Sequence, residues 1–454
     1  MKQALVPLLI GLSLNVSVVL AQSRAAVAIK DARVVTVSGE ELPKATVVMR
    51  NGLIIEVGAA ANIPAGAWVI NGDGLTVYPG FIDALSSWGI PAPAASRGAG
   101  TTTQPATAAA AATEPRARGP EDRPQTFSYE RAADLVTPSD SRLEIARAAG
   151  FTSAATYPTR GIFQGLGAMI DLAGERGRDM VIAQPIGQQI SFRVGGFGRT
   201  GFPGSLMGNI SYVRQLFLDL DQYQQAKQIY ASNPTGNRRP EYDHTLEGLA
   251  DSPRLLLPGD EVQQIERMLN FAPELKKPFL LYGLHEAYER IDLLKQAHAP
   301  LLISLKWPEK PKDGDPSEVS SFRELTMRDK APSVPALLAK AGVRFAFYTD
   351  GIESAADLKK ALKKTLDAGL SRADAIRALT LNVAEIYGVD DRMGTIDKGK
   401  IANLVVMKGD AFEDKTTVEY VFVDGQEFHP SKDLQQGPPA GGGRRPGMPS
   451  EELQ

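Results

Sequence analysis

The chain has 454 residues, of which 43% are hydrophobic and 23% are charged. This composition is ordinary for a globular protein, and the length exceeds that of one small domain. A formal net charge of −3 excludes the basic footprint of a nucleic-acid-binding protein or of a protein that binds an anionic membrane. The absence of cysteine excludes disulfides and thiolate metal sites. Only four histidines occur, namely His244, His285, His298 and His429.

The first 21 residues are typical of a signal peptide. Lys2 supplies a positive charge, Leu5 to Leu20 form a mostly apolar run, and Ala21 ends an acceptable cleavage site. A short membrane anchor is the alternative, but two polar residues interrupt the run, and a spanning helix needs roughly 20 apolar residues. We therefore expect export to the periplasm or the medium. No later segment is long and apolar enough to predict a membrane span.

Two stretches near the ends of the chain predict short strands. Residues 26–80 contain runs of β-branched residues and the turn signal Asn51-Gly52. Residues 401–429 repeat this pattern around Asp424-Gly425. Neither stretch has enough strands for an independent sheet. We expect them to pair into one small β-sandwich domain, built from residues 22–79 and 395–430.

Between these stretches, helical patterns alternate with apolar strands. The runs at 278–282, 301–305 and 343–348 each follow a segment with helical periodicity. Continuous apolar strands that alternate with helices predict a parallel sheet buried on both faces. We expect an α/β fold in which residues 80–394 form a closed (β/α)8 barrel of the TIM type.

Three segments do not follow this alternation. Residues 91–124 are rich in Ala, Thr, Pro and Gly and cannot bury enough apolar surface to fold alone, so we expect a low-complexity insertion after the first barrel strand. Residues 431–454 are expected to form a disordered tail. The glycine-rich run from Gly195 to Gly201 lacks the Gly-Lys-Ser/Thr ending of a phosphate-binding loop, which favours a flexible barrel loop.

Three motifs bracket residues 30 to 425. They are Gly72-Asp73-Gly74-Leu75-Thr76-Val77-Tyr78-Pro79-Gly80-Phe81-Ile82-Asp83, then Phe347-Tyr348-Thr349-Asp350, and finally Leu379 to Gly388 continuing through Met393 to Val406. Together they resemble the first barrel strand, the eighth strand and the last helix of the amidohydrolase superfamily, in members similar to imidazolonepropionase and dihydroorotase. The resemblance implies a divalent metal at the C-terminal mouth of the barrel. Asn403 stands where the family usually carries Asp.

The same resemblance implies a His-x-His motif after Pro-Gly-Phe-Ile-Asp, with both imidazoles on one face of the strand. Here the two positions are Ala84 and Ser86. Alanine cannot ligate a metal, and a neutral serine hydroxyl is a poor replacement for an imidazole on zinc. We find no counterpart of the bridging carboxylated lysine of binuclear members. The sequence therefore predicts a degenerate metal site.

Asp350 matches the family's catalytic Asp, which moves a proton between the attacking water and the leaving nitrogen; the alternative is a turn carboxylate. His285 and Asp260 are the nearest counterparts of ligands after the sixth and fifth strands. Their alternatives are a partly buried histidine and a carboxylate at a helix start. With Asp350 they could supply the three ligands of a catalytic zinc or manganese ion. Lys306 either binds an anionic group of the substrate or forms part of a turn.

Two hypotheses follow. In the first, the chain is a degenerate homologue that works without a metal, either as a small-molecule-binding protein or as the partner of a homologous amidohydrolase subunit. In the second, it hydrolyses non-peptide carbon–nitrogen bonds of a small molecule at an atypical single-metal site. The missing His-x-His motif favours the first.

Overall fold

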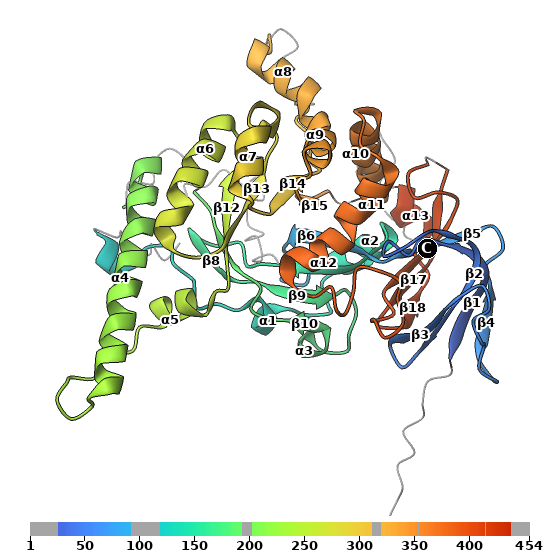
Figure 1. The fold of residues 1–454 in the computed structure, drawn as a ribbon, viewed down its shortest axis with the longest axis horizontal. Coiled ribbons are helices and arrows are strands. Elements are labelled where there is room, and N and C mark those ends of the chain that lie inside the picture. Colours follow the sequence, from blue (N-terminus) through green and yellow to red (C-terminus); the bar gives the residue numbers. More distant parts are fainter. Residues whose placement is uncertain are drawn as a thin grey trace, which may run out of the picture.

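The two ends of the chain lie together on one side of the molecule, beside a central part in which helices and strands alternate (Figure 1). This computed structural model describes residues 26–91, 119–192, 202–310, 319–352, 354–413 and 415–436. The predicted α/β class is confirmed. The expected signal peptide, most of the insertion at 91–124, the loop from Gly195 to Gly201 and most of the expected tail lie outside the described residues. In the described part of the chain, no helix is long and apolar enough to cross a membrane.

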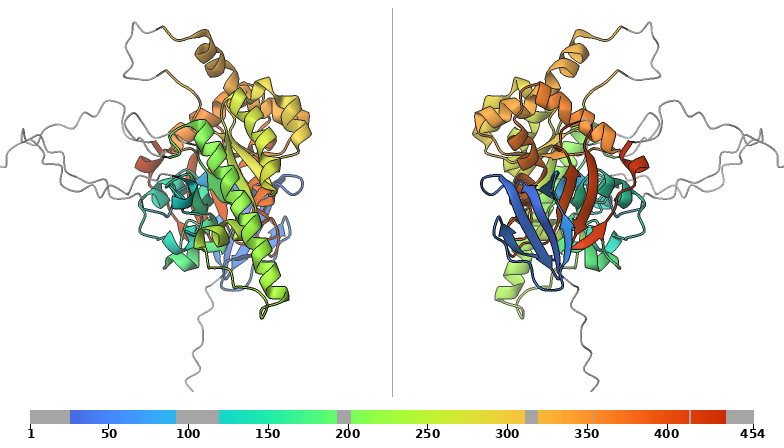
Figure 2. Two further views of the ribbon diagram at one scale, coloured as in Figure 1. Left: turned by 90° about the vertical axis from the view of Figure 1, so that its left-hand side faces the viewer. Right: turned by 90° about the vertical axis from the view of Figure 1, so that its right-hand side faces the viewer.

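Strands from both ends of the chain form one sheet (Figure 2). Its order is β18 (Gln426–Phe428), β17 (Thr417–Val423), β16 (Leu404–Lys408), β5 (Leu75–Pro79), β1 (Val27–Val34), β2 (Leu42–Arg50) and β3 (Leu53–Gly58), and β4 (Trp68–Asn71) pairs with β1. Because β16 pairs antiparallel with β5, the expected pairing of the two ends is present. The ladders describe a single sheet, so a two-layer sandwich is not confirmed. The domain boundaries stay predictions.

Both two-residue turns predicted in this sheet are present. Asn51 and Gly52 join β2 to β3 with φ of 53° and 78°, and Asp424 and Gly425 join β17 to β18 with φ of 49° and 68°. Positive φ at both central residues is the turn geometry that matches the twist of paired strands. A Cβ added to Gly425 would lie 3.1 Å from the Cα of Gly52, so the two turns pack against each other.

The central strands form two further sheets. One has the order β10 (Val181–Ala183), β9 (Ala168–Asp171), β7 (Phe151–Thr156) and β6 (Phe81–Ser86). The other has the order β15 (Phe345–Tyr348), β14 (Leu301–Ser304), β13 (Phe279–Gly283), β12 (Leu255–Gly259), β11 (Gln188–Ile190) and β8 (Phe163–Leu166). Strands β11 to β15 run parallel, as do β6 and β7, whereas β9 and β8 pair antiparallel with β7 and β11. Within the described ranges these ladders do not close into one barrel of eight parallel strands. No backbone pairing joins β15 to β6 there.

The side chains of the central strands alternate between two apolar clusters. One cluster joins strands of both sheets and includes Ala84, Leu256, Leu280, Leu302 and Ala346. The next residues along the strands pack against helices in the other cluster, as Leu257, Leu281, Ile303 and Phe347 do. Both faces of these strands are therefore buried, which explains why their sequences are continuously apolar.

The helices lie mainly outside these strands (Figure 1). They are α1 (Ala132–Leu135), α2 (Arg142–Ala148), α3 (Gly177–Met180), α4 (Leu206–Ser232), α5 (His244–Asp251), α6 (Val262–Phe271), α7 (Ile291–Ala297), α8 (Phe322–Lys330), α9 (Val334–Ala341), α10 (Ala355–Asp367), α11 (Arg372–Leu379), α12 (Leu381–Tyr387) and α13 (Lys432–Gln436). Ser371 caps α11, because its Oγ accepts the N–H of Asp374 at 3.0 Å. After Ser371 the chain forms the two short helices α11 and α12, which Thr380 separates.

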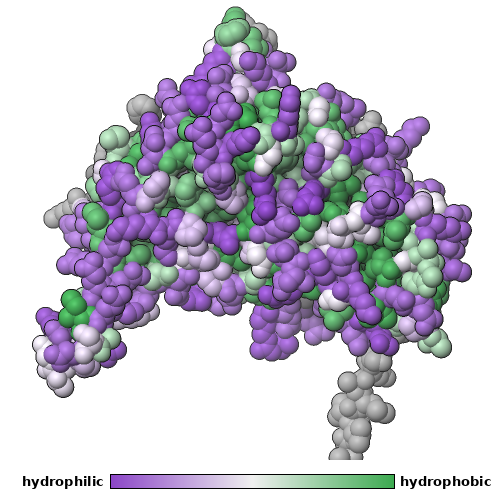
Figure 3. All heavy atoms as spheres, in the orientation of Figure 1, coloured by the Kyte–Doolittle hydropathy of each residue, from purple (hydrophilic) through white to green (hydrophobic). Residues whose placement is uncertain are grey.

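Two helices project from the body. The 27-residue α4 was not predicted from the sequence; its buried side chains lie between Asn209 and Leu220, and its second half is rich in glutamine. Helix α8 buries none of its residues. Val319 and Phe322, at its beginning, are 90% and 85% exposed, and hydrophobic spheres mark this protrusion in Figure 3.

Candidate functional site

Four polar residues follow the C-terminal ends of four adjacent strands. They are Asp260 after β12, His285 after β13, Lys306 after β14 and Asp350 after β15. These strands pair in parallel in this order, so the four residues lie along one edge of the sheet. In α/β barrels this is the edge that carries active sites. We take it as the candidate functional site.

Asp260 and His285 form a direct pair. The imidazole Nδ1 of His285 lies 2.9 Å from Oδ1 of Asp260, and the backbone N–H of His285 donates to the same oxygen at 3.4 Å. Burial raises the pKa of Asp260, but the hydrogen bond and the charge of His285 outweigh it and lower that pKa below its usual value. The other imidazole nitrogen, Nε2, is buried without a hydrogen-bond partner. The pair thus fixes the orientation of the ring and leaves Nε2 without a partner among the described residues.

The backbone before His285 is unusual. Gly283 has a φ of 104°, and the fully buried Leu284 has a φ of 70°. A leucine rarely adopts the left-handed region, where non-glycine residues are strained. This turn directs the histidine back toward Asp260 at the end of the neighbouring strand.

Asp350 has a different partner. Its Oδ2 accepts a hydrogen bond of 3.0 Å from the hydroxyl of Ser304, and that hydroxyl accepts the backbone N–H of Lys306 at 3.1 Å. Burial and the charge of Asp350 raise the pKa of Tyr348 well above its usual value, so a neutral phenol stands beside the carboxylate. The side chain of Lys306 is exposed and makes no ion pair within the described ranges. The sequence analysis did not identify the hydrogen bond between Ser304 and Asp350, although Ser304 is the only polar residue of β14.

Asp83 is a second residue that the sequence analysis did not assign to the site. It is fully buried at the middle of β6, where its Oδ2 accepts a hydrogen bond of 2.6 Å from the hydroxyl of Thr349. The backbone N–H groups of Thr349 and Leu85 donate to the same carboxylate. Burial raises the pKa of Asp83 to about 7, although these hydrogen bonds lower it. Asp83 therefore connects β6 to the residue that precedes Asp350.

Comparison with known proteins finds a family similarity in the C-terminal part of the chain. A family model described as the amidohydrolase family matches residues 279–428, which run from β13 to β18 and include Asp350. The fold is similar to that of an amidohydrolase from Thermotoga maritima, with a TM-score of 0.70 and 24% identity over 89% of this chain and 100% of that one. Residues 279–428 of this chain are thus similar to the amidohydrolase family. No curated protein matches its sequence.

Other amidohydrolase-like structures are more distant. A prolidase complexed with N-methylphosphonate-L-proline has a TM-score of 0.51 and 15% identity, over 90% of this chain and 100% of that chain. A Xaa-Pro dipeptidase with methionine bound in its active site has a TM-score of 0.52 and 13% identity, over 89% of this chain and 100% of that one. At these identities the similarity shows the fold alone.

The described residues do not fit the catalytic metal ion that the similarity to amidohydrolases implies. Ala84 is fully buried in the apolar cluster, and the hydroxyl of Ser86 accepts the N–H of Trp88 and lies 3.3 Å from that of Thr156. Residues 79–91 contain no histidine, so a shift of the motif along the strand does not restore the pair.

The other possible ligands divide into two groups. Asp260 pairs with His285, while Asp350 is bonded to Ser304. Across the described ranges, no group of three or more His, Cys, Asp or Glu side chains is placed to hold a metal. A catalytic zinc needs about three protein ligands and an open position for water. The assignment of Asp260, His285 and Asp350 as one ligand set stays a prediction.

The remaining histidines lie elsewhere. His244 begins α5 and contacts Tyr129, and His298 ends α7 with a φ of 50°. His429 follows β18 and lies 2.7 Å from Glu427. None of the three follows one of the parallel strands, so none belongs to the candidate site.

Proposed function

We propose that this chain is an exported, degenerate member of the amidohydrolase superfamily that binds a small molecule at its strand ends. In this proposal its strands form a (β/α)8-type barrel that carries no metal-dependent hydrolysis of its own. The observation that carries the proposal is the apolar, fully buried Ala84 at the first of the two positions expected to hold histidines. Loss of these ligands removes the source of an activated water but leaves the edge formed by β12 to β15.

The proposed role is that of a binding or partner subunit. The fold and the polar residues at the strand ends are retained, which supports binding of a small molecule. The possible metal ligands, however, form two separate pairs, Asp260 with His285 and Asp350 with Ser304. We propose a homologous, catalytically active amidohydrolase as the protein partner. Co-purification from the native source tests this part, and recovery of the chain as a free monomer without that homologue contradicts it.

The second candidate function is hydrolysis of a non-peptide carbon–nitrogen bond at an atypical site. The observation that favours it is the Asp260–His285 pair, because Nε2 of the buried imidazole has no partner. This pair and Asp350 are the residues on which that function would depend. It requires the loop of Asp350 to adopt a conformation that brings the carboxylate to the pair.

Metal content separates the two functions. The mature chain is purified after growth with added zinc and manganese, and its metal is measured by elemental mass spectrometry beside Asp350→Asn and His285→Ala variants. We expect far less than one equivalent of metal in all three proteins. Near-stoichiometric metal that either variant loses overturns the proposal in favour of the hydrolase, and cyclic amides, imides and dipeptides are then the substrates to screen.

Export is tested separately. In the proposal, the first 21 residues are removed on secretion, so the N-terminal residue of the periplasmic or secreted chain is Gln22. N-terminal sequencing of the chain from each cell fraction measures this. A chain that keeps its first residues and sediments with membranes contradicts cleavage and indicates an anchor.

A further inference from the structure

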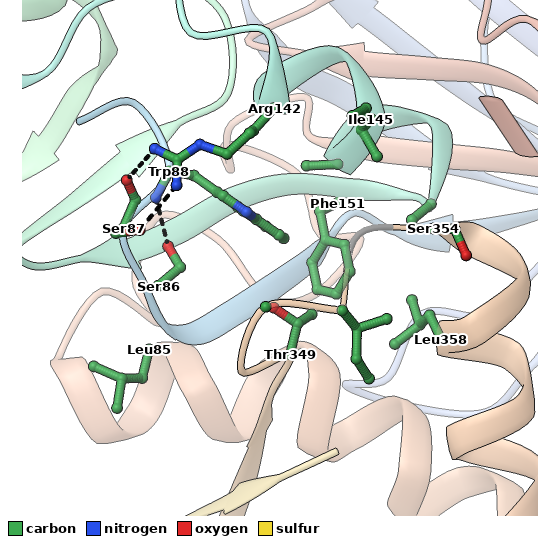
Figure 4. Close-up of a pocket in the computed structure, with 14 residues that line it drawn as sticks. Leu85, Ser86, Ser87, Trp88, Arg142, Ile145, Phe151, Thr349, Ser354 and Leu358 are labelled. Atoms are coloured by element: carbon green, nitrogen blue, oxygen red, sulfur yellow. Dashed lines mark hydrogen bonds between the residues drawn. The ribbon is translucent and has the colours of Figure 1, made fainter. Parts of the chain in front are cut away.

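A pocket lies outside the candidate site, between the ends of β6 and β15 and the helices α2 and α10 (Figure 4). Its volume is about 90 Å³. Its walls are mainly apolar and include Leu85, Trp88, Ile145, Phe151, Ile352 and Leu358. Trp88 and Phe151 meet edge to face, with ring centroids 5.2 Å apart, and give the pocket an aromatic wall.

The polar groups at one end of the pocket already have partners. The guanidinium of Arg142 donates to the hydroxyl and carbonyl of Ser87, to the carbonyl of Ile90 and to the carboxylate of Asp140. Its charge is balanced by Asp140 at 2.7 Å. The hydroxyl of Ser86 is bonded within its own strand end and to β7. Arg142 is therefore not free to bind an anion.

The polar groups at the other side of the pocket are also engaged. Thr349 directs its hydroxyl and its N–H to the buried carboxylate of Asp83. Ser354 caps α10, because its hydroxyl accepts the N–H of Asp357 at 3.1 Å and donates to the carboxylate of the same residue at 2.7 Å. The side-chain donors and acceptors that line the pocket are thus used within the protein.

The apolar walls and the engaged polar groups favour an apolar molecule in the pocket. A buried water is held by two to four polar partners, and apolar cavities bind apolar molecules instead. A pocket of this volume has room for several heavy atoms, since one water needs roughly 10–15 Å³ of such space. We propose that the pocket binds an apolar group of a small molecule, either one aromatic ring or a short branched aliphatic chain. The pocket contains none of Asp260, His285, Lys306 and Asp350, so this inference does not depend on the proposed function.

Toluene and phenol test the proposal, because the two molecules share a shape but phenol carries a hydroxyl. Binding to the full chain is measured by isothermal titration calorimetry and by the change in tryptophan fluorescence, because Trp88 lines the pocket. We expect saturable toluene binding and at least about fivefold weaker phenol binding, since the side-chain donors and acceptors that line the pocket already have partners and offer none to the phenol hydroxyl. Absence of saturable toluene binding overturns the proposal. Equal affinity for toluene and phenol contradicts the claim that the pocket selects an apolar group.

Variants in α2 and at Ala149, the residue that follows it, test whether toluene binds in this pocket. Ala149→Leu fills the pocket and is expected to lower toluene affinity by more than about tenfold, since the leucine occupies the ligand's volume. Glu144→Leu adds the same side chain to an exposed position of α2 that does not line the pocket and should bind as the parent does. Ile145→Ala enlarges the pocket and is expected to shift preference from toluene to n-propylbenzene. Unchanged toluene affinity in a folded Ala149→Leu protein, or unchanged preference in Ile145→Ala, places the binding elsewhere and overturns the assignment.

Discussion

Thr349 donates both its hydroxyl and its backbone N–H to the buried carboxylate of Asp83, 266 positions earlier in the chain. This contact joins the end of β15 to β6, where the described part of the chain has no backbone ladder. The hydroxyl of Tyr387, the last residue of α12, donates to the carbonyl of Ala84 at 2.6 Å and so links that helix to β6. Side-chain hydrogen bonds thus stand where a closed barrel would have backbone pairing.

Thr349→Val should destabilise the fold. The substitution keeps the shape of the side chain but removes the donor to Asp83, so a fully buried carboxyl group loses its shortest hydrogen bond. We expect the free energy of unfolding in urea to fall by about 1–3 kcal/mol. Thr326→Val on the projecting α8 is the control, and its effect should stay within about 0.5 kcal/mol. Equal effects of the two substitutions would show that the contact with Asp83 contributes nothing specific.

Stability should fall as the pH rises from about 4 to above 7. Burial raises the pKa values of Asp83 and Asp171 to about 7. Each group binds more protons in the folded than in the unfolded chain within this window, so its contribution is full below the unfolded pKa and is lost as the pH passes the folded pKa. Carboxylates with lowered pKa values, such as Glu286, act oppositely, but at more acidic pH. Between pH 4.5 and 8, the free energy of unfolding in urea should fall by roughly 1–4 kcal/mol less in Asp83→Asn than in the parent protein. A parallel profile for this variant would be inconsistent with a raised pKa at Asp83.

Gly425→Ala should destabilise more than Gly66→Ala. Both glycines have a left-handed φ, of 68° and 77°, so both substitutions carry the same backbone strain. A Cβ at Gly425 would also meet the backbone of Gly52 at 3.1 Å, whereas nothing lies within 4 Å of one at Gly66. We expect an additional loss of about 1–2 kcal/mol for Gly425→Ala in thermal or urea unfolding. Equal losses would indicate that the two turns do not pack closely in solution.

Local chemistry explains which features the sequence predicted. The turns at Asn51-Gly52 and Asp424-Gly425 need two successive residues with positive φ, and these residue pairs favour that conformation independently of the rest of the fold. The apolar strands were also predicted, because burial on both faces leaves a continuous pattern. Their parallel order then placed Asp260 and His285 at neighbouring strand ends.

Features that depend on distant partners were not predicted. In the sequence, Asp83 is one residue of the motif that ends at the first strand. Its link to β15 depends on Thr349, which comes close to Asp83 only when the chain folds. Helix α4 buries side chains in its first half only, so its second half carries no apolar stripe that indicates a helix. The closed barrel was expected from the alternation of helices and apolar strands over residues 80–394, but the antiparallel β8 and β9 intervene between β7 and β11.

Asn403→Asp, which restores the residue usual in the family, should destabilise this chain. The amide of Asn403 donates to Oδ1 of the buried Asp171 at 2.6 Å and to Ser153 at 3.0 Å, while its carbonyl oxygen accepts the N–H of Asp424. The substitution keeps that acceptor but sets a second carboxylate against Asp171. We expect a loss of about 3–5 kcal/mol at pH 8, since two buried carboxylates cannot both ionise at this distance.

The loss should be smaller at pH 5, where one of the two carboxyl groups is protonated and can donate to the other. Adding Asp171→Asn supplies an amide from the other side and should recover most of the stability at pH 8. A double-mutant cycle in urea measures this coupling, and we expect it to favour the double variant by at least about 2 kcal/mol. A double variant no more stable than Asn403→Asp alone would mean that Asn403 is not required as a donor to Asp171. Its presence in place of Asp would then have another cause.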